Sequence, residues 1–311
     1  MTTSQFAFPG GPELRPLTAD DILPAELPGP PIDQGSPRDP RPVVAVDHDQ
    51  LVGVGWTSLD PVLELYFAEI NVVVDHRRRG VGTALFRAVC AGADPSFPVC
   101  ARVMSSQPWR RGFADSLGCV TRVRCPEVWI DPVSEPGRAW ADRQVLPPGF
   151  RTLPLAEVDR ELVIGAWASY YDWAHRPLGA VRTERLREHW DRYADGLDPQ
   201  LSMITTDEPG TVVAFSLVTP DGWQGRTFVV AETADPAQPD GDALLTATVA
   251  ASIRALARRG TRLVELEGHA TDPHSPALAR SLPPGGSDPM EIVELTRSAQ
   301  SVAARCSSTA A

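Results

Sequence analysis

The residues with the most distinctive chemistry lie in "INVVVDHRRRGVGTALFRAV", Ile70 to Val89, where three consecutive arginines precede Gly80 and Gly82. Apolar residues before the arginines favour a strand, and apolar residues spaced by four after them favour an amphipathic helix. Such a helix start attracts anions, because its first backbone N–H groups lack internal partners and its dipole adds positive potential. Glycine allows close approach to the backbone, and arginine binds phosphate bidentately. The stretch therefore predicts a pyrophosphate-binding strand–loop–helix.

Two other phosphate-binding loops do not fit these residues. The stretch has no Gly-Lys-Ser/Thr of a P-loop NTPase, and Leu85 occupies the position of the third glycine in the dinucleotide-binding G-x-G-x-x-G fingerprint. A nucleic-acid patch is disfavoured, because the formal net charge of −11 repels polyanions. An exposed basic turn at a helix start is the alternative that the residues alone leave open.

The same stretch resembles the acetyl-CoA-binding motif of the GNAT superfamily of N-acyltransferases, on the residues "VVVDHRRRGVGTAL". That motif is Gln/Arg-x-x-Gly-x-Gly/Ala between a strand and a helix; Arg77, Gly80 and Gly82 fill it, although the family often has proline in place of Val74. The resemblance implies that backbone amides after Arg77 bind the pyrophosphate and that the strand end holds the pantetheine arm. The cofactor-binding residues that it implies are Val72, Val73, Val74, Arg77, Arg78, Arg79, Gly80, Val81, Gly82 and Thr83.

The resemblance also implies catalysis by direct attack of an amine on the thioester, which requires a base for the ammonium proton and an acid for the leaving thiolate. Side chains five residues apart on a strand point to opposite faces of the sheet, so only one of Glu64 and Glu69 is expected to face the substrate. Glu69 is the predicted base, because it lies nearer the expected thioester carbonyl. A solvated strand carboxylate is the alternative for Glu69. The acid of the family is a tyrosine in the next short helix; Ala114 occupies its position here, and Cys119 falls on an expected core strand.

The second half of the sequence repeats the order of elements but not the chemistry of the loop. In its corresponding stretch, "AETADPAQPDGDALLTATV", no arginine is present, and Asp240 and Asp242 flank a single glycine. Two carboxylates at that point would repel a diphosphate by roughly a kcal/mol or more each. We therefore predict a degenerate GNAT-like domain. In some tandem members of the family the second half is the catalytic one, so this sequence inverts that pattern.

An aromatic and charged cluster, "WASYYDWAHRP", also lies in the second half. It either lines an acceptor pocket or, as we favour, buries Trp167 and Tyr171, four residues apart, in the core while its other members cap the helix. His269 in "LEGHATD" is expected to be a satisfied strand-end histidine rather than a base.

Hydrophobic periodicity and breaker residues predict two similar halves, each running strand, helical or loop region, three strands, helix, strand, short helix and strand. This order predicts an α+β (mixed α/β) class, and the resemblance makes it two tandem GNAT-like domains, each a central mixed, mostly antiparallel sheet flanked by helices. The expected boundaries are 1–132 for the domain with the intact loop, 133–148 for a linker, 149–300 for the degenerate domain and 301–311 for a flexible tail.

Composition limits the remaining possibilities. Of 311 residues 42% are hydrophobic, which suits sizeable cores. The start of the sequence lacks the regions of a signal peptide and no run of about 18 apolar residues occurs, so we expect a soluble cytoplasmic protein without membrane contact. Five cysteines without C-x-x-C spacing suit reduced thiols. No metal site is expected; a zinc site from Cys119, Cys125 and a distant histidine is the alternative.

The predicted function is an acetyl-CoA-dependent N-acetyltransferase that acts on a small-molecule amine, with acetyl-CoA or another acyl-CoA bound in the N-terminal domain. The alternative is a non-catalytic protein in which bound CoA is structural or sensed. We expect a monomer or a homodimer, and the acidic chain favours cationic amines as acceptors by electrostatic steering.

Overall fold

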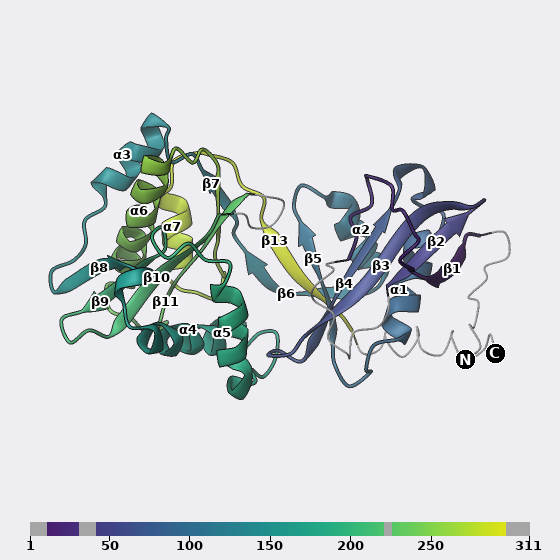
Figure 1. Cartoon of the computed structure of the whole chain (residues 1–311), viewed down its shortest axis with the longest axis horizontal. Helices are drawn as coiled ribbons and strands as arrows, with labels where there is room; N and C mark the ends of the chain where they lie inside the picture. Colours follow the sequence, from purple (N-terminus) through teal and green to yellow (C-terminus); the bar gives the residue numbers. More distant parts are fainter. Residues whose placement is uncertain (1–10, 31–41, 221–225, 297–311) are drawn as a thin grey trace. The chain divides into compact units, whose positions relative to one another are not determined.

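The computed structural model of the protein describes residues 11–30, 42–220 and 226–296 (Figure 1). They form two sheets flanked by helices, in two compact units. The first unit holds the described residues up to Val103, Gln107–Thr121 and those from Ile292 on; the second holds Met104–Ser106 and Arg122–Glu291. The two mixed sheets confirm the predicted α+β class. The tail expected over 301–311 lies outside the described residues.

The first sheet has seven strands in the order β1-β2-β3-β4-β5-β13-β6. Neighbours from β1 to β4 are antiparallel, whereas β4 and β5 are parallel. Two apolar segments around Asp47–Gln50 in the sequence predict a hairpin, and the structure confirms it between β2 and β3. His48 and Asp49, at φ 46° and 65°, form the left-handed turn that a tight hairpin favours. The strands are β1 (Glu13–Pro16), β2 (Val43–Asp47), β3 (Gln50–Asp60), β4 (Leu65–Val72), β5 (Val99–Met104), β6 (Cys119–Cys125) and β13 (Met290–Leu295).

Helix α1 (Val81–Ala91) packs on β3 and β4 where the sheet carries glycine. A Cβ added at Gly53 would lie 2.8 Å from Leu85 Cδ1 of α1, and one at Gly55 would lie 3.4 Å from Val89 Cγ1 of the same helix. The helix can approach this closely because both positions lack a side chain. The contact fixes the start of α1 beside the end of β4. The other helices of the unit are η1 (Val74–His76) and α2 (Pro108–Ser116).

The second sheet has six strands in the order β7-β12-β11-β10-β9-β8. Only the pairing of β11 with β12 is parallel among its described ladders. Its strands are β7 (Val128–Ile130), β8 (Phe150–Pro154), β9 (Met203–Asp207), β10 (Val212–Thr219), β11 (Thr227–Thr233) and β12 (Val264–Glu267). Its helices are α3 (Glu135–Arg143), η2 (Leu155–Glu157), α4 (Arg160–His175), η3 (Thr183–Arg185), α5 (Leu186–Ala194), α6 (Gly241–Arg259) and α7 (Ser275–Ser281).

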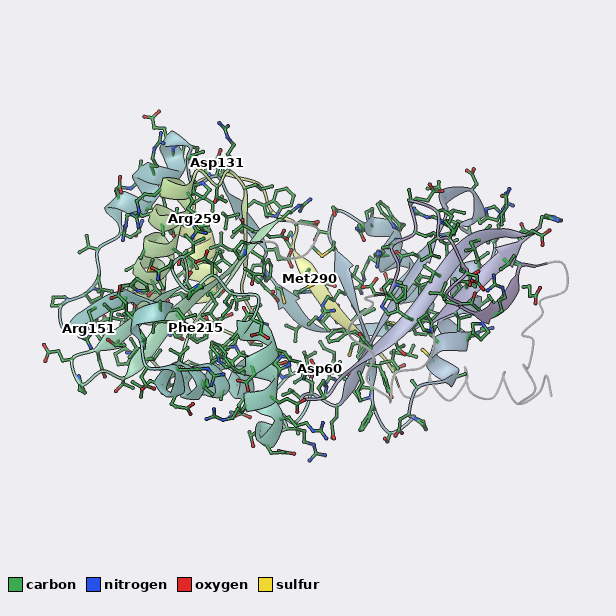
Figure 2. All side chains as sticks on the ribbon, in the orientation of Figure 1. Asp60, Asp131, Arg151, Phe215, Arg259 and Met290 are labelled. Carbon is green, nitrogen blue, oxygen red and sulfur yellow. The ribbon has the colours of Figure 1, made fainter. Side chains whose placement is uncertain are left out.

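Each sheet contains a strand from the other half of the sequence. The stretch "CVTRVRCPEVWIDP", expected as one strand, forms β6 and β7, because Pro126 has no N–H to donate to a ladder. Strand β7 pairs with β12, and β13, which begins at Met290 (Figure 2), lies between β5 and β6. The predicted domain boundaries concern the two sequence repeats rather than these compact units, and they stay a prediction.

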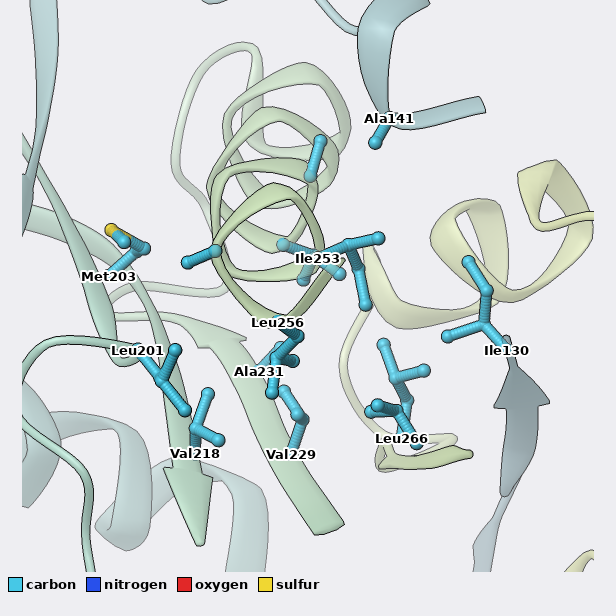
Figure 3. Close-up of a cluster of buried hydrophobic side chains, with 14 of the residues drawn as sticks. Ile130, Ala141, Leu201, Met203, Val218, Val229, Ala231, Ile253, Leu256 and Leu266 are labelled. Carbon is cyan, nitrogen blue, oxygen red and sulfur yellow. The ribbon is translucent and has the colours of Figure 1, made fainter. Parts of the chain in front are cut away.

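The core of the second unit forms between α6 and its sheet. In Figure 3, Ile253 and Leu256 of α6 lie over Val229 and Ala231 of β11. All four side chains are buried. Gly260 at the end of the helical pattern "GDALLTATVAASIRALARRG" predicts a C-cap. The helix does end there, and Gly260 adopts φ 78° and donates its N–H to the carbonyl oxygens of the last turn. Of the helices that the structure describes, none combines the length and the apolar character that a bilayer crossing requires.

Part of the expected linker is folded. Helix α3 begins after Ser134, whose Oγ accepts a hydrogen bond from the Gly137 N–H at 3.1 Å. Its Trp140 is 1% exposed and donates from Nε1 to Ser281 Oγ at 3.2 Å. A Pro-containing polar segment thus forms a helix because an N-cap starts it and a buried aromatic side chain holds it.

We expect Ser134→Ala to lower the free energy of unfolding by about 1 kcal/mol, because it removes the N-cap of α3. The hydroxyl also donates to the Asp131 carbonyl at 2.7 Å, so the variant loses two bonds. Urea denaturation followed by circular dichroism measures the change. Ser134→Thr keeps the hydroxyl and should match the wild type; equal stability of the alanine variant would contradict the capping role.

Candidate cofactor and catalytic site

Helix α1 begins with unsatisfied N–H groups after a left-handed turn. Arg78 has φ 63°, and Gly80, the N-cap residue, has φ 84°. Within the described part of the chain no side chain caps this helix, and the Ala84 N–H donates to the Gly80 carbonyl at 3.0 Å. The N–H groups of residues 81–83 therefore face the start of the helix, where an anion would accept from them.

Of the three arginines, Arg77 contacts neighbouring elements of the fold, and Arg78 and Arg79 extend into solvent. Arg77 donates from Nε to the Val72 carbonyl at 3.0 Å, and its guanidinium lies over the Trp109 ring, 5.5 Å from the centroid. Arg78 and Arg79 are exposed. Arg77 therefore stabilises the loop against β4 and α2, whereas the other two guanidinium groups present charge to solvent at the helix start.

Strands β4 and β5 separate beside the loop. They pair in parallel at Tyr66–Val99 and Phe67–Cys100. Within the described chain no later pair joins them, although β4 continues to Val72. The edge of residues 68–72 that faces β5 is therefore open to an extended ligand, which can hydrogen-bond to it as an added strand would.

Val73 and Val74 follow the open edge. The Val73 N–H donates to the Val52 carbonyl at 3.0 Å, and the Val74 side chain, at the start of η1, is 69% exposed. A pocket of about 400 Å³ lies beside both valines, and residues 50–52 and 75–76 also line it. The strand end thus borders open space, while one of its amides is already bonded to β3.

Glu69 forms an ion pair with Arg110, which also bonds Asn71, and the sequence did not indicate this bridge between α2 and β4. Arg110 of α2 donates from Nη1 to Glu69 Oε2 and from Nη2 to Asn71 Oδ1, both at 2.9 Å. The Glu69 side chain is 14% exposed. Glu64 lies before β4, in a turn with φ 49°, so it does not share this strand edge. The only sequence signal for the bridge is a basic residue in the short helix "QPWRRGF".

No phenol occupies the usual position of the general acid. Ala114 is buried in an apolar cluster. Tyr66, the tyrosine of this unit, is also buried, and its hydroxyl accepts from the Asp94 N–H at 3.4 Å. Cys119 packs among apolar side chains, and burial raises the pKa of its thiol to about 11. The half-buried Cys119 therefore packs against the apolar core.

We expect Cys119 to resist alkylation by iodoacetamide at pH 8. With a pKa of about 11, its thiolate fraction at pH 8 is roughly 200-fold below that of an ordinary cysteine with a pKa near 8.5, and partial burial slows access further. Peptide mapping by mass spectrometry after timed labelling measures the rate, with urea-unfolded protein as the control. Labelling of the folded protein as fast as that of glutathione would contradict the raised pKa and the partial burial of the Cys119 thiol.

In the second unit, side chains of the protein itself occupy the corresponding helix start. Asp240 is the N-cap of α6, with φ 55°. The His274 ring packs against the backbone of Gly241, so closely that an added Cβ would lie 2.3 Å from Nε2. His274 Nδ1 lies 2.8 Å from Asp242 Oδ1. A histidine–aspartate pair therefore occupies the end of the helix where the first unit leaves N–H groups open.

The aromatic cluster of α4 packs as predicted at Trp167 and Tyr171 but not at Tyr170, which is buried instead of capping the helix. Trp167 and Tyr171 are buried, with ring centroids 5.0 Å apart. Tyr170 is buried as well, and its hydroxyl lies 3.2 Å from His269 Nδ1. The same nitrogen lies 2.9 Å from Glu232 Oε1, so His269 is partnered, as expected from the sequence.

The sequence and the fold of this chain are similar to those of acetyltransferases. No protein-family model matches the chain. The chain is 31% identical over 217 residues to the mycothiol acetyltransferase of Clavibacter sepedonicus and 30% identical over 217 residues to that of Clavibacter michiganensis subsp. michiganensis. Each alignment covers 68% of this chain and 66% of the relative, so the chain spans slightly less than two thirds of their length.

Solved structures share the fold. A GCN5-related N-acetyltransferase from Sphaerobacter thermophilus superposes with a TM-score of 0.60 at 16% identity, covering 81% of this chain and 79% of its own. A tandem GNAT protein from the clavulanic acid biosynthesis pathway superposes with a TM-score of 0.58 at 18% identity, covering 84% of this chain and 85% of its own. The tandem arrangement predicted from the sequence is therefore present in the structure.

Proposed function

We propose that the chain belongs to the GNAT superfamily in its tandem form and that it is an acetyl-CoA-dependent N-acetyltransferase of the cytoplasm whose acceptor is a small-molecule amine. Bound acetyl-CoA, or another acyl-CoA, supplies an activated thioester. The names of the curated relatives, mycothiol acetyltransferases, support acetyl transfer to a small molecule.

The observation that carries the proposal is the uncapped start of α1 beside the open edge of β4. Free N–H groups follow Gly80, exposed guanidinium groups of Arg78 and Arg79 flank them, and β4 beyond Phe67 has no ladder partner in β5 among the described residues. A diphosphate suits the first feature and an extended amide-containing arm suits the second. Both features occur in one connected segment, which fits CoA.

In this proposal Glu69 removes the ammonium proton of the acceptor, the freed nitrogen lone pair attacks the thioester carbonyl carbon, and the nitrogen then releases its second proton to solvent. The C–N bond forms, the C–S bond breaks, and the sulfur leaves as thiolate. Arg110 holds the carboxylate in place through Nη1 and ties it to Asn71. With Ala114 at the usual tyrosine position, solvent supplies the proton to the departing thiolate.

We propose that the second half binds no CoA. The His274–Asp242 pair fills the start of α6, and the carboxylates of Asp240 and Asp242 repel a diphosphate. This half then contributes structure rather than a second cofactor site.

Calorimetric titration of the full chain with acetyl-CoA tests the binding step. We expect one equivalent per chain, unchanged in Asp242→Ala, because the only proposed cradle is that of α1. Two equivalents would contradict the proposal for the second half, and no binding would remove the proposed function altogether.

The second candidate is a protein that binds CoA without turnover. Two observations favour it: Ala114 replaces the acid, and Glu69 is bound to Arg110. A panel of polyamines, aminoglycosides and amino sugars, assayed by release of free CoA thiol, separates the candidates. Turnover above a no-enzyme control supports the transferase; binding without turnover of any amine supports the non-catalytic protein.

A further inference from the structure

Three side chains with metal-binding chemistry converge in the second unit. Cys125 ends β6, Glu267 ends β12, and His269 follows two residues later. One potential ligand atom of each lies within 4.8 Å of the other two. Cys125 and His269 are buried, Glu267 is half-buried, and Cys125 forms no disulfide. We propose that these residues form a binding site for Zn²⁺, with a fourth position for water.

The ligand types select this metal. Zinc in proteins is bound by thiolate at about 2.3 Å and by imidazole or carboxylate at about 2.0–2.2 Å, in a tetrahedral arrangement. Ligand atoms in such a site lie about 3.5 Å apart. Side-chain rotations that move each ligand atom by about an ångström would bring the three atoms observed here to that spacing. A soft thiolate and an imidazole disfavour Mg²⁺ and Ca²⁺, which take oxygen ligands.

The surroundings of His269 provide a second, independent observation. Its Nδ1 lies 2.9 Å from Glu232 Oε1 and 3.2 Å from the Tyr170 hydroxyl. Glu232 is fully buried. Histidine ligands of metals usually donate their other ring N–H to a carboxylate, which fixes the tautomer and orients the ring. An Nδ1–H bonded to Glu232 leaves the Nε2 lone pair for a cation.

Buried carboxylates around the three residues also lack positive partners. Glu127 is 4% exposed, lies against Glu265 and Glu267, and its Oε2 has no hydrogen-bond partner within the described chain. Glu232 Oε2 also has no hydrogen-bond partner among the described residues. Arg226 lies 3.5 Å from Glu265, but among the described residues no arginine pairs with Glu127 or Glu232. Buried carboxylates without a counter-charge are costly, and a divalent cation offsets that cost.

The proposed site differs from the zinc alternative that the sequence suggested. Cys119 packs in the apolar core of the first unit, whereas Cys125 groups with Glu267 and His269 in the second. Glu267 could not be singled out from the sequence, because a carboxylate two residues before a histidine is common. The metal would join the end of β6 to the end of β12 inside one unit, which is a structural role separate from acetyl transfer.

Metal binding is tested on the full chain after removal of metals with a chelator. Zn²⁺ affinity is measured by competition with a chromophoric chelator, and Co²⁺ is added separately to read the ligands from its absorption spectrum. We expect one Zn²⁺ per chain and a Co²⁺ spectrum with thiolate-to-metal charge transfer and tetrahedral d–d bands. Zn²⁺ should also raise the melting temperature of the wild type.

Matched variants assign the ligands. Cys125→Ser should abolish the charge-transfer band and weaken Zn²⁺ binding at least about 100-fold, whereas Cys119→Ser should change neither. Glu232→Gln, which changes the partner of His269 Nδ1 and leaves the three proposed ligands in place, should weaken binding about 10–100-fold and keep the band. Each variant is checked for folding by circular dichroism.

Three results would overturn the proposal: no charge-transfer band in the wild type, a band that persists in Cys125→Ser, or Zn²⁺ binding no tighter in the wild type than in Cys125→Ser. The wild-type spectrum decides even if a ligand variant fails to fold. None of these readouts depends on acetyltransferase activity, so the site and the proposed function can fail independently.

Discussion

Gly82→Glu is expected to weaken acetyl-CoA binding at least about 100-fold while the protein remains folded. A Cβ at Gly82 would lie 3.5 Å from the Phe113 ring and 3.8 Å from Val72 Cγ2, which are ordinary contacts. A carboxylate in the first turn also suits the helix dipole, so α1 should form normally. The same carboxylate would stand among the N–H groups proposed to bind the pyrophosphate. At about 4 Å and an effective dielectric constant near 20, each pair of like charges costs about 4 kcal/mol.

Calorimetry and thermal unfolding together measure this effect, and Gly165→Glu is the matched control. Gly165 is an exposed helical glycine of α4 with open space around it, so the control adds the same charge away from the loop. The control should bind acetyl-CoA like the wild type. Wild-type affinity in a folded Gly82→Glu protein would show that the start of α1 does not hold the pyrophosphate.

The elements of the fold could be predicted because local signals agree with tertiary packing at most positions. The spacing of Val81, Leu85 and Val89 predicted α1, and all three side chains are buried against the sheet. Gly260 ends α6 in the predicted left-handed conformation. Such features depend on periodicity and on backbone conformations that few residues adopt, and both are local properties of the sequence.

The partners of the strands could not be predicted in the same way. Strand β13 reads as the last strand of the second half, yet it lies between β5 and β6 in the first sheet. Its burial pattern is alternating at most positions, and that pattern fits any sheet with one buried face. Pairing between distant strands is decided by tertiary packing, so the sequence indicated that β13 exists but not where it pairs.

The candidate site was predictable where backbone conformation and charge define it. The loop follows from arginine and glycine spacing, and the structure leaves the start of α1 uncapped, as an anion site requires. The Arg110 bridge was not predictable, because α2 meets β4 only in the folded protein and one arginine in a short helix carries no spacing signal. The same limit applies to His274, which reaches Gly241 from a helix more than thirty residues away.

Glu69→Gln is expected to lower kcat about 100- to 1,000-fold with little change in the affinity for acetyl-CoA. General base catalysis contributes typically 10²–10⁴-fold, and glutamine cannot accept the proton. Glutamine keeps the size of the side chain and an oxygen for Arg110, so the bridge to α2 can persist. Initial rates with the best amine of the panel, measured against pH, give kcat and the two KM values.

The pH profile separates a base from a merely structural carboxylate. As pH rises toward the pKa of the amine, more acceptor enters already deprotonated, so the defect of Glu69→Gln should shrink. Glu64→Gln, the same change at a residue that precedes β4, is the matched control and should retain wild-type kcat. A defect in Glu69→Gln that is constant with pH, or equal loss in the Glu64→Gln control, would mean that Glu69 does not remove the proton and that β4 contributes only binding.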